Sequence, residues 1–183
     1  LVETRGLRTE EMVAHWSARF SIDGTDHEAL MAEYDRRMVE TMKREVPLME
    51  GARELIGMFR ELGLPLAMAT CSTEEHIDAV MEKHGLRPSF DQLVSAAVDM
   101  PGKPHPEVFI KTAALLRVDP TRCLVFEDSF NGLVAAKAAR MKAVAMPDPL
   151  EYDQERFGAA DLKIRSLTEF TLETFNKLQE DQW

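Results

Sequence analysis

The chain has 183 residues, of which 45% are apolar and 30% are charged, and it contains 9 glycines, 9 prolines and 2 cysteines. This composition excludes collagen-like, low-complexity and disulfide-scaffold proteins, and the chain is long enough to bury an apolar core. Thirty-two acidic and 22 basic side chains give a net charge of −10, which disfavours nucleic acid as a partner. No apolar run reaches the ~20 residues of a membrane helix, so no membrane partner is expected.

Residues 1–46 have the pattern of a helical pair, rich in methionine and charge. Thr9 is predicted to cap a first helix and Asp26 a second, with an interhelical turn at Asp23-Gly24-Thr25. In the second helix, apolar residues recur every four positions and form one stripe suited to packing: Leu30, Tyr34, Met38 and Met42.

After Pro47, helical stretches alternate with short apolar runs. Predicted helices cover residues 51–62, 73–83, 106–116, 129–140 and 168–178, and predicted strands cover 65–70, 91–95, 123–126, 142–146 and 162–164. This alternation predicts an α/β fold in which helices cross over a parallel sheet.

The two cysteines, Cys71 and Cys123, adjoin apolar runs, and neither belongs to a Cys-x-x-Cys pair. We expect both to be structural thiols in or near the core, with a metal ligand or a nucleophile as the alternative. Free thiols and the lack of a signal peptide fit a cytoplasmic location.

Polar side chains follow three of the apolar runs, where ligands bind in open α/β sheets. Thr70 ends the first run, Lys103 lies in the loop beyond the second, and Glu127-Asp128 ends the third. A hydroxyl and an ammonium suit phosphate oxygens, and two carboxylates suit Mg²⁺. Each piece alone also has a structural interpretation. Thr70 is then a packed or capping threonine, the loop of Lys103 an ordinary turn, and Glu127-Asp128 the acidic start of a helix.

The combination resembles the haloacid-dehalogenase superfamily over residues 47–178. The matching motifs are Leu66-Ala67-Met68-Ala69-Thr70, Lys103-Pro104-His105-Pro106 and Phe126-Glu127-Asp128-Ser129 with Asn131-Gly132. The resemblance is strongest to β-phosphoglucomutase-like enzymes, especially sugar-phosphate phosphatases similar to 2-deoxyglucose-6-phosphate phosphatase. It implies a Rossmann-like parallel sheet with helices on both faces, formed by residues 47–183, and a partial helical cap formed by residues 1–46.

The resemblance also implies roles for the residues around the phosphate. Thr70 would hydrogen-bond the transferring phosphoryl group, with Cys71 and Ser72 completing a substrate-binding loop. Lys103 would neutralise charge on the phosphate and on the nucleophile.

By the same resemblance, Asp128 would ligate Mg²⁺ and Glu127 would assist it directly or through water.

Arg140 departs from the glycine that the superfamily usually has after its alanine-rich helix. If this position needs a left-handed backbone, arginine costs about 1 kcal/mol there.

Three further residues are weaker candidates. Arg8, in Gly6-Leu7-Arg8-Thr9, is a candidate substrate contact from the cap, with a solvated surface arginine as the alternative. Glu75 and His76 begin the helix after Thr70 and are expected to border the pocket.

The superfamily's nucleophile motif, Asp-x-Asp-Gly at the end of a central strand, has no counterpart in this chain. The only superficial match is Ile22-Asp23-Gly24-Thr25, where Ser21 takes the nucleophile position and no apolar strand precedes it. We therefore expect the natural protein to carry a further N-terminal segment, and the 183 residues alone to show no turnover. Loss of that strand would leave two neighbouring strands with unpaired backbone groups.

The resemblance implies a Mg²⁺-dependent phosphoric monoester hydrolase, acting on a small phosphorylated sugar or sugar alcohol through an aspartyl-phosphate in the full-length protein. A phosphomutase of the same fold and a degenerate, non-catalytic phosphate-binding module are the alternatives. A dehalogenase would not need Glu127-Asp128, and a dinucleotide enzyme would carry a Gly-x-Gly-x-x-Gly after a strand. The protein is expected to be a monomer or a weak homo-oligomer.

Overall fold

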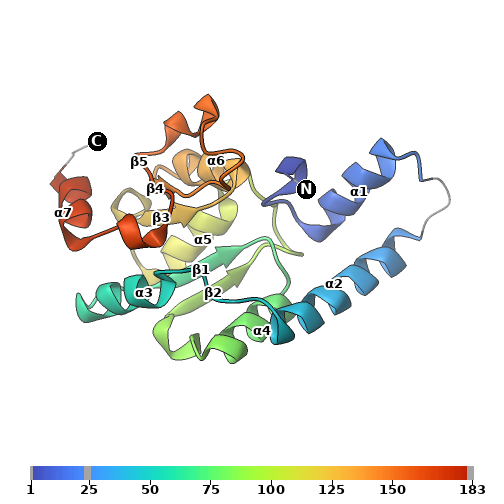
Figure 1. Cartoon of the computed structure of the whole chain (residues 1–183), viewed down its shortest axis with the longest axis horizontal. Coiled ribbons are helices and arrows are strands. Elements are labelled where there is room, and N and C mark those ends of the chain that lie inside the picture. Colours follow the sequence, from blue (N-terminus) through green and yellow to red (C-terminus); the bar gives the residue numbers. More distant parts are fainter. Residues whose placement is uncertain (1, 23–25, 181–183) are drawn as a thin grey trace.

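The computed structural model describes residues 2–22 and 26–180, so the predicted turn at residues 23–25 lies outside the described part. The described helices are α1 (Thr9–Arg19), α2 (His27–Arg44), α3 (Ala52–Glu61), α4 (Glu74–His84), α5 (Glu107–Leu116), α6 (Phe130–Ala138) and α7 (Leu172–Glu180). The strands are β1 (Ala67–Thr70), β2 (Gln92–Ser95), β3 (Leu124–Glu127), β4 (Lys142–Ala145) and β5 (Leu162–Lys163). Figure 1 shows how these elements are arranged.

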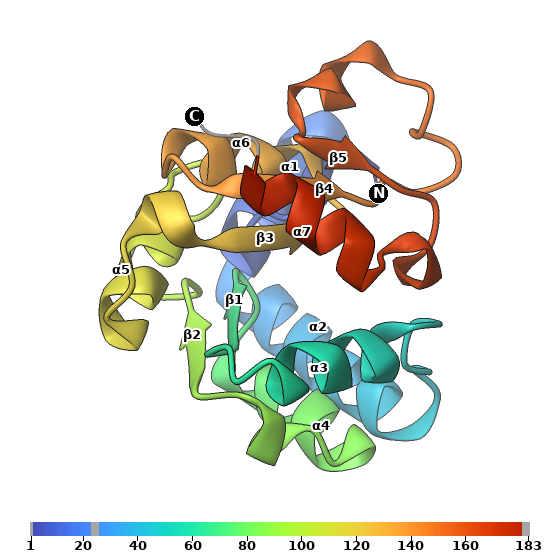
Figure 2. The same cartoon turned by 90° about the vertical axis from the view of Figure 1, so that its left-hand side faces the viewer.

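All paired strands are parallel, which confirms the predicted α/β fold. They form two sheets, one of β1 and β2 and one in the order β3-β4-β5 (Figure 2). In the described residues, β1 and β3 therefore each have a paired neighbour on one side only. The sequence predicts a short edge strand at residues 162–164, and β5 lies at the edge of its sheet, next to β4.

Helices cover both faces of the sheets. Alternate residues of β4 divide between two apolar clusters, with Ala143 and Ala145 on one face and Val144 on the other. Helices α5 and α6 pack on the first face, while α3 and α7 pack on the second. Helix α4 packs against β1 and β2 through Ile77 and Met81. The alternation places opposite side chains of each strand in different clusters, as expected for a sheet covered on both sides.

The α1–α2 hairpin, formed by helices α1 and α2, is built differently. Helix α2 has no buried residue, and Leu30, the first residue of the predicted apolar stripe, is 40% exposed. The Asp26 side chain accepts a hydrogen bond from Ala29 N and caps α2, as predicted. The prediction for Thr9 was wrong: Arg8 occupies the cap position of α1, and the Thr9 hydroxyl donates instead to Asp35.

The N-terminal segment lies beyond the carboxyl ends of the strands, together with α1 (Figure 1). Arg5 binds Asp148 and Glu151 in the segment after β4. Arg140 has a φ of 62°, so the position after α6 does need the left-handed backbone. Within residues 2–22 and 26–180, no helix is long and apolar enough to cross a membrane.

Candidate functional site

Lys103 is the centre of the site. Its side chain is only 7% exposed, and its ammonium forms an ion pair with Glu127 Oε1 and donates to Ala69 O at 3.1 Å. The ammonium also lies 4.7 Å from the centre of the Phe109 ring. Because Ala69 belongs to β1 and Glu127 to β3, one cation links the carboxyl ends of the two separate sheets.

The loop after β1 lies against Lys103 and is held by short polar contacts. Thr70 Oγ1 accepts a hydrogen bond from Ser72 N at 3.1 Å, and Ser95 Oγ donates to Ser72 O at 2.6 Å. Lys103 N donates to Cys71 Sγ at 3.3 Å. The loop is therefore preorganised, with Thr70 half-buried at the strand end.

Burial raises the pKa of the Cys71 thiol, and the nearby Lys103 offsets this effect only in part. The thiol therefore stays protonated and neutral near pH 7, which is the state of a structural cysteine. Cys123 is half-buried, and burial raises its pKa too. Cys71 belongs to an apolar cluster and Cys123 packs against the same cluster, which agrees with the expected place of both thiols in or near the core.

Glu127 is buried, and both of its carboxylate oxygens are engaged. Oε1 binds Lys103, and Oε2 accepts a hydrogen bond from Ser129 Oγ at 3.1 Å. A Cβ placed on Gly132 would lie 1.9 Å from Glu127 Oε2, so only glycine leaves room for this carboxylate. Glu127 is thus fixed by its neighbours, and its main contact is Lys103.

Asp128 follows directly and is exposed. No cluster of three or more His, Cys, Asp or Glu side chains suited to a metal occurs among the described residues. Mg²⁺ needs fewer protein ligands than that, because one or two carboxylates usually hold it together with water and substrate phosphate. The exposed Asp128 carboxylate fits such a site, with Glu127 beside it.

Arg8 approaches the same loop from the start of α1. A Cβ on Gly102 would lie 2.8 Å from Arg8 Cγ, so the arginine stem rests on the residue before Lys103. Arg8 Nη2 donates to Glu11 Oε1 at 3.1 Å, and Arg8 N donates to Glu11 Oε2. In the described part of the chain, Arg8 Nε is buried without a hydrogen-bond partner. Arg8 is thus a half-buried cation whose stem lies against Gly102, the residue before Lys103.

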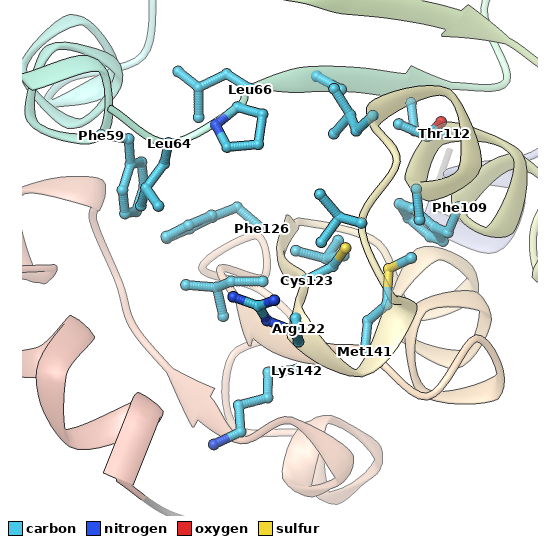
Figure 3. A pocket seen from close by; sticks show the side chains of 18 of the residues that line it. Phe59, Leu64, Leu66, Phe109, Thr112, Arg122, Cys123, Phe126, Met141 and Lys142 are labelled. Atoms are coloured by element: carbon cyan, nitrogen blue, oxygen red, sulfur yellow. The ribbon is translucent and has the colours of Figure 1, made fainter. Parts of the chain in front are cut away.

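A cavity of about 1060 Å³ separates β1 from β3. Backbone and side chains of both strands line it from Leu66 to Ala69 and from Leu124 to Glu127, and its walls are mostly apolar. Figure 3 shows Phe126 and Phe59 on one side of this cavity and Phe109 on the other. Since Ala69 and Glu127 line it and also bind Lys103, the cavity runs along the two strands toward the site.

A family model for haloacid dehalogenase-like hydrolases matches residues 4–140. The chain belongs to this family. Membership gives the enzyme class, a hydrolase, and confirms the resemblance drawn from the strand-end motifs.

Several relatives cover nearly all of the chain. Hexitol phosphatase B of Escherichia coli K12 is 38% identical over 171 residues, which are 93% of this chain and 77% of that protein. A probable pseudouridine-5'-phosphatase of Drosophila melanogaster is 32% identical over 94% of this chain and 76% of its own length. Both are phosphatases by name.

Solved structures of the haloacid dehalogenase-like fold match as well. CbbY from Rhodobacter sphaeroides, in complex with phosphate, superposes with a TM-score of 0.76 at 27% identity, covering 84% of this chain and 70% of that one. The β-phosphoglucomutase of Clostridium difficile gives a TM-score of 0.79 at 21% identity, covering 96% and 78%. The second likeness supports the fold alone.

The structure brings most of the predicted residues together. Thr70, Cys71, Lys103 and Glu127 form one connected group, and Arg8 rests on the loop of Lys103. His76 does not border this group, because its ring is turned toward α2.

Sequence reasoning missed Glu11, whose only local signal was a carboxylate three residues after Arg8. It placed Gly132 in a matching motif and Gly102 in the turn before Lys103, but it did not show why either position needs a glycine.

Proposed function

We propose that the protein is a Mg²⁺-dependent phosphatase of small phosphorylated sugars or sugar alcohols. The observation that carries the proposal is the buried Lys103 ammonium, placed where β1 and β3 end, with the Thr70 hydroxyl and the exposed Asp128 carboxylate at the same edge. The names of the relatives point the same way, since hexitol phosphatase B acts, by its name, on a hexitol phosphate.

Three groups bind the phosphoryl group in this proposal. The Thr70 hydroxyl donates a hydrogen bond to a phosphoryl oxygen, and the backbone of Cys71 and Ser72 borders the same oxygen. Lys103 supplies positive charge where negative charge develops, and it needs no reorganisation because Glu127 and Ala69 already hold it.

Asp128 is the residue that would hold Mg²⁺, with Glu127 beside it. Bound there, the ion would neutralise phosphoryl charge that two carboxylates otherwise repel. Glu127 has its oxygens engaged by Lys103 and Ser129, so its first role is to fix the lysine.

In this proposal the nucleophile is an aspartate, which forms an aspartyl-phosphate. This aspartate lies on a strand that is not among these 183 residues. The cavity between β1 and β3 supports this, because it is apolar, lies along both strands and reaches toward Lys103. A strand seated there would pair with the free edges of both sheets and bring its last residue to the site. The 183 residues alone are then inactive.

The test measures phosphate release by the full-length natural protein from hexitol phosphates and hexose phosphates, with Mg²⁺ and with EDTA. We expect Mg²⁺-dependent release that is lost in Asp128→Ala and falls at least ~100-fold in Lys103→Ala, since each removes a charge that stabilises the transition state. Asp153→Ala is the matched control, because its side chain is 92% exposed and distant in sequence from the site.

Equal activity in wild type and Asp128→Ala would contradict the proposal. Conversion of one sugar phosphate into an isomer without phosphate release would replace it with a phosphomutase. Binding of phosphate without turnover by the full-length protein would replace it with a non-catalytic module.

A further inference from the structure

The position of Arg8 depends on polar contacts as well as on apolar burial. Helix α1 buries only Val13 and Ser17, and α2 buries no residue. Tyr34, Met38 and Met42 of α2 are half-buried, so the apolar contact of the hairpin is partial and its hydrogen bonds and ion pairs contribute to holding it in place. Those contacts therefore help to decide where Arg8 lies relative to Lys103.

One such contact directly adjoins Arg8. The next residue, Thr9, donates from its hydroxyl to Asp35 Oδ1 at 3.2 Å. Asp35 lies near the middle of α2 and its side chain is 22% exposed. This hydrogen bond joins the first residue of α1 to α2. It therefore fixes the backbone position of Arg8, the residue directly before α1.

A second contact joins Asp35 to the α/β part of the molecule. His76 Nε2 lies 3.3 Å from Asp35 O and 3.4 Å from Asp35 Oδ1, and its side chain is 4% exposed. Both oxygens can only accept, so Nε2 must carry a hydrogen and donate. A donor buried to this extent and satisfied by one residue is a strong local constraint.

His76 is the third residue of α4, and α4 begins directly after the loop of Thr70 and Ser72. Its backbone N–H donates to Thr73 Oγ1, which caps the helix. Figures 1 and 2 both show α4 lying alongside α2. A continuous set of contacts therefore runs from the phosphate loop through His76 and Asp35 to Thr9 and Arg8.

We propose that Asp35 and His76 are positioning residues that hold Arg8 over the phosphate ester, through the hydroxyl of Thr9. The inference rests on the proposed function, because it assigns Arg8 to the substrate. The unpartnered Nε of Arg8 supports that assignment, since a buried charged donor gains most from an anionic partner. Neither positioning residue touches the substrate.

The test is a double-mutant cycle in the full-length protein, read as KM and kcat for its best phosphate ester. Arg8→Ala should raise KM by ~10–100-fold, the loss of one charge-assisted hydrogen bond. Asp35→Ala should raise KM by about 5-fold or more and change kcat by less than about 2-fold, the signature of lost binding that the substrate and the transition state share equally. In the Arg8→Ala background, Asp35→Ala should have no further effect on KM, because it acts through Arg8.

Two further variants separate positioning from general damage. Glu40→Ala removes a carboxylate that is 62% exposed on the same helix, and it should leave both constants unchanged. Thr9→Val keeps the side-chain shape and removes only the hydroxyl, so it should raise KM even if Asp35→Ala does not fold. His76→Gln keeps a donor near the position of Nε2 and should retain a KM closer to wild type than His76→Ala.

Several outcomes would overturn the inference. Equal effects of Asp35→Ala in both backgrounds would show that it acts independently of Arg8, and a wild-type KM in Thr9→Val would remove the link. A wild-type KM in Arg8→Ala, with Lys103→Ala inactive, would refute this inference and leave the proposed function standing. No phosphate release by wild type from any ester would overturn both.

Discussion

The α/β part of the molecule and the α1–α2 hairpin are stabilised in different ways. In the α/β part, Leu133, Ala143 and Val144 are completely buried, and the clusters on both faces are apolar. In the hairpin, α2 buries nothing and carries ion pairs among its own exposed residues, such as Arg36 with Glu33. Apolar packing therefore stabilises the α/β part, while the contacts of the hairpin include polar ones such as that of Thr9 with Asp35.

The largest loss of stability is expected where a polar contact lies inside the apolar part. Lys103→Met leaves Glu127 as an unpaired buried carboxylate, so the free energy of unfolding should fall by ~3–5 kcal/mol. Urea unfolding followed by circular dichroism measures this loss. Lys177→Met removes the lysine of an exposed ion pair, and should leave the unfolding midpoint almost unchanged because solvent screens such pairs. Equal midpoints for the two variants would refute the contrast.

A matched pair of leucines tests the apolar contribution directly. Leu133→Ala in α6 removes a side chain with no exposed area, and should lower the free energy of unfolding by ~2–5 kcal/mol. Leu30→Ala in α2 removes a side chain that is 40% exposed, and should change the free energy of unfolding by less than about 0.5 kcal/mol. Denaturant titration of both variants gives the comparison. A loss at Leu30 as large as at Leu133 would show that the hairpin has a core of its own.

Glycine substitutions test the contact of the N-terminal segment with the α/β part, with a glycine inside α3 as the comparison. Gly6 has a φ of +82°, and a Cβ there would lie 2.6 Å from Ser129 Oγ, so Gly6→Ala should cost at least ~1–2 kcal/mol. Gly57→Ala in α3 meets nothing within 4 Å and should stabilise by ~0.5–1 kcal/mol, because alanine favours a helix. Thermal melts of the two variants should shift in opposite directions, and shifts in the same direction would count against this account.

The smallest effect is expected at an exposed polar contact of the α/β part. The backbone N–H of Leu66 and the Arg60 guanidinium lower the pKa of Asp91. A carboxylate whose pKa is lower in the folded state stabilises the protein at pH values above its unfolded-state pKa. This stabilisation is lost as the pH falls through the folded-state pKa. Asp91→Asn should therefore lower the melting temperature at pH 7, and the difference from wild type should shrink below about pH 4. A difference independent of pH would contradict this sign.

The strands and core helices could be predicted from sequence to within a few residues. Apolar runs such as 123–126 and 142–146 are local, and turn residues bound them, so their pattern alone indicates β3 and β4. The convergence of Thr70, Lys103 and Glu127 also followed, because parallel strands end at one edge. These predictions depend on periodicity and topology, which a single sequence contains.

Contacts between distant polar side chains could not be predicted in the same way. Threonine is a residue type typical of helix caps, but the Thr9 hydroxyl donates its hydrogen bond to Asp35, 26 residues later in the chain. His76 looked like a pocket residue from its place after β1, and only the packing of α4 on α2 turns it to Asp35. Gly132 belongs to the motif that follows Glu127, but the physical reason for the glycine, the Glu127 carboxylate packed against it, is visible only in the structure.

Among the described residues, β1 and β3 each have one unpaired edge, which has a consequence for how the 183 residues behave in solution. An unpaired edge recruits any extended backbone, whatever its side chains, and so acts as a template for aggregation. With two such edges facing an apolar cavity, the 183 residues on their own should precipitate as their concentration rises, and a chaperone that shields extended segments should delay it.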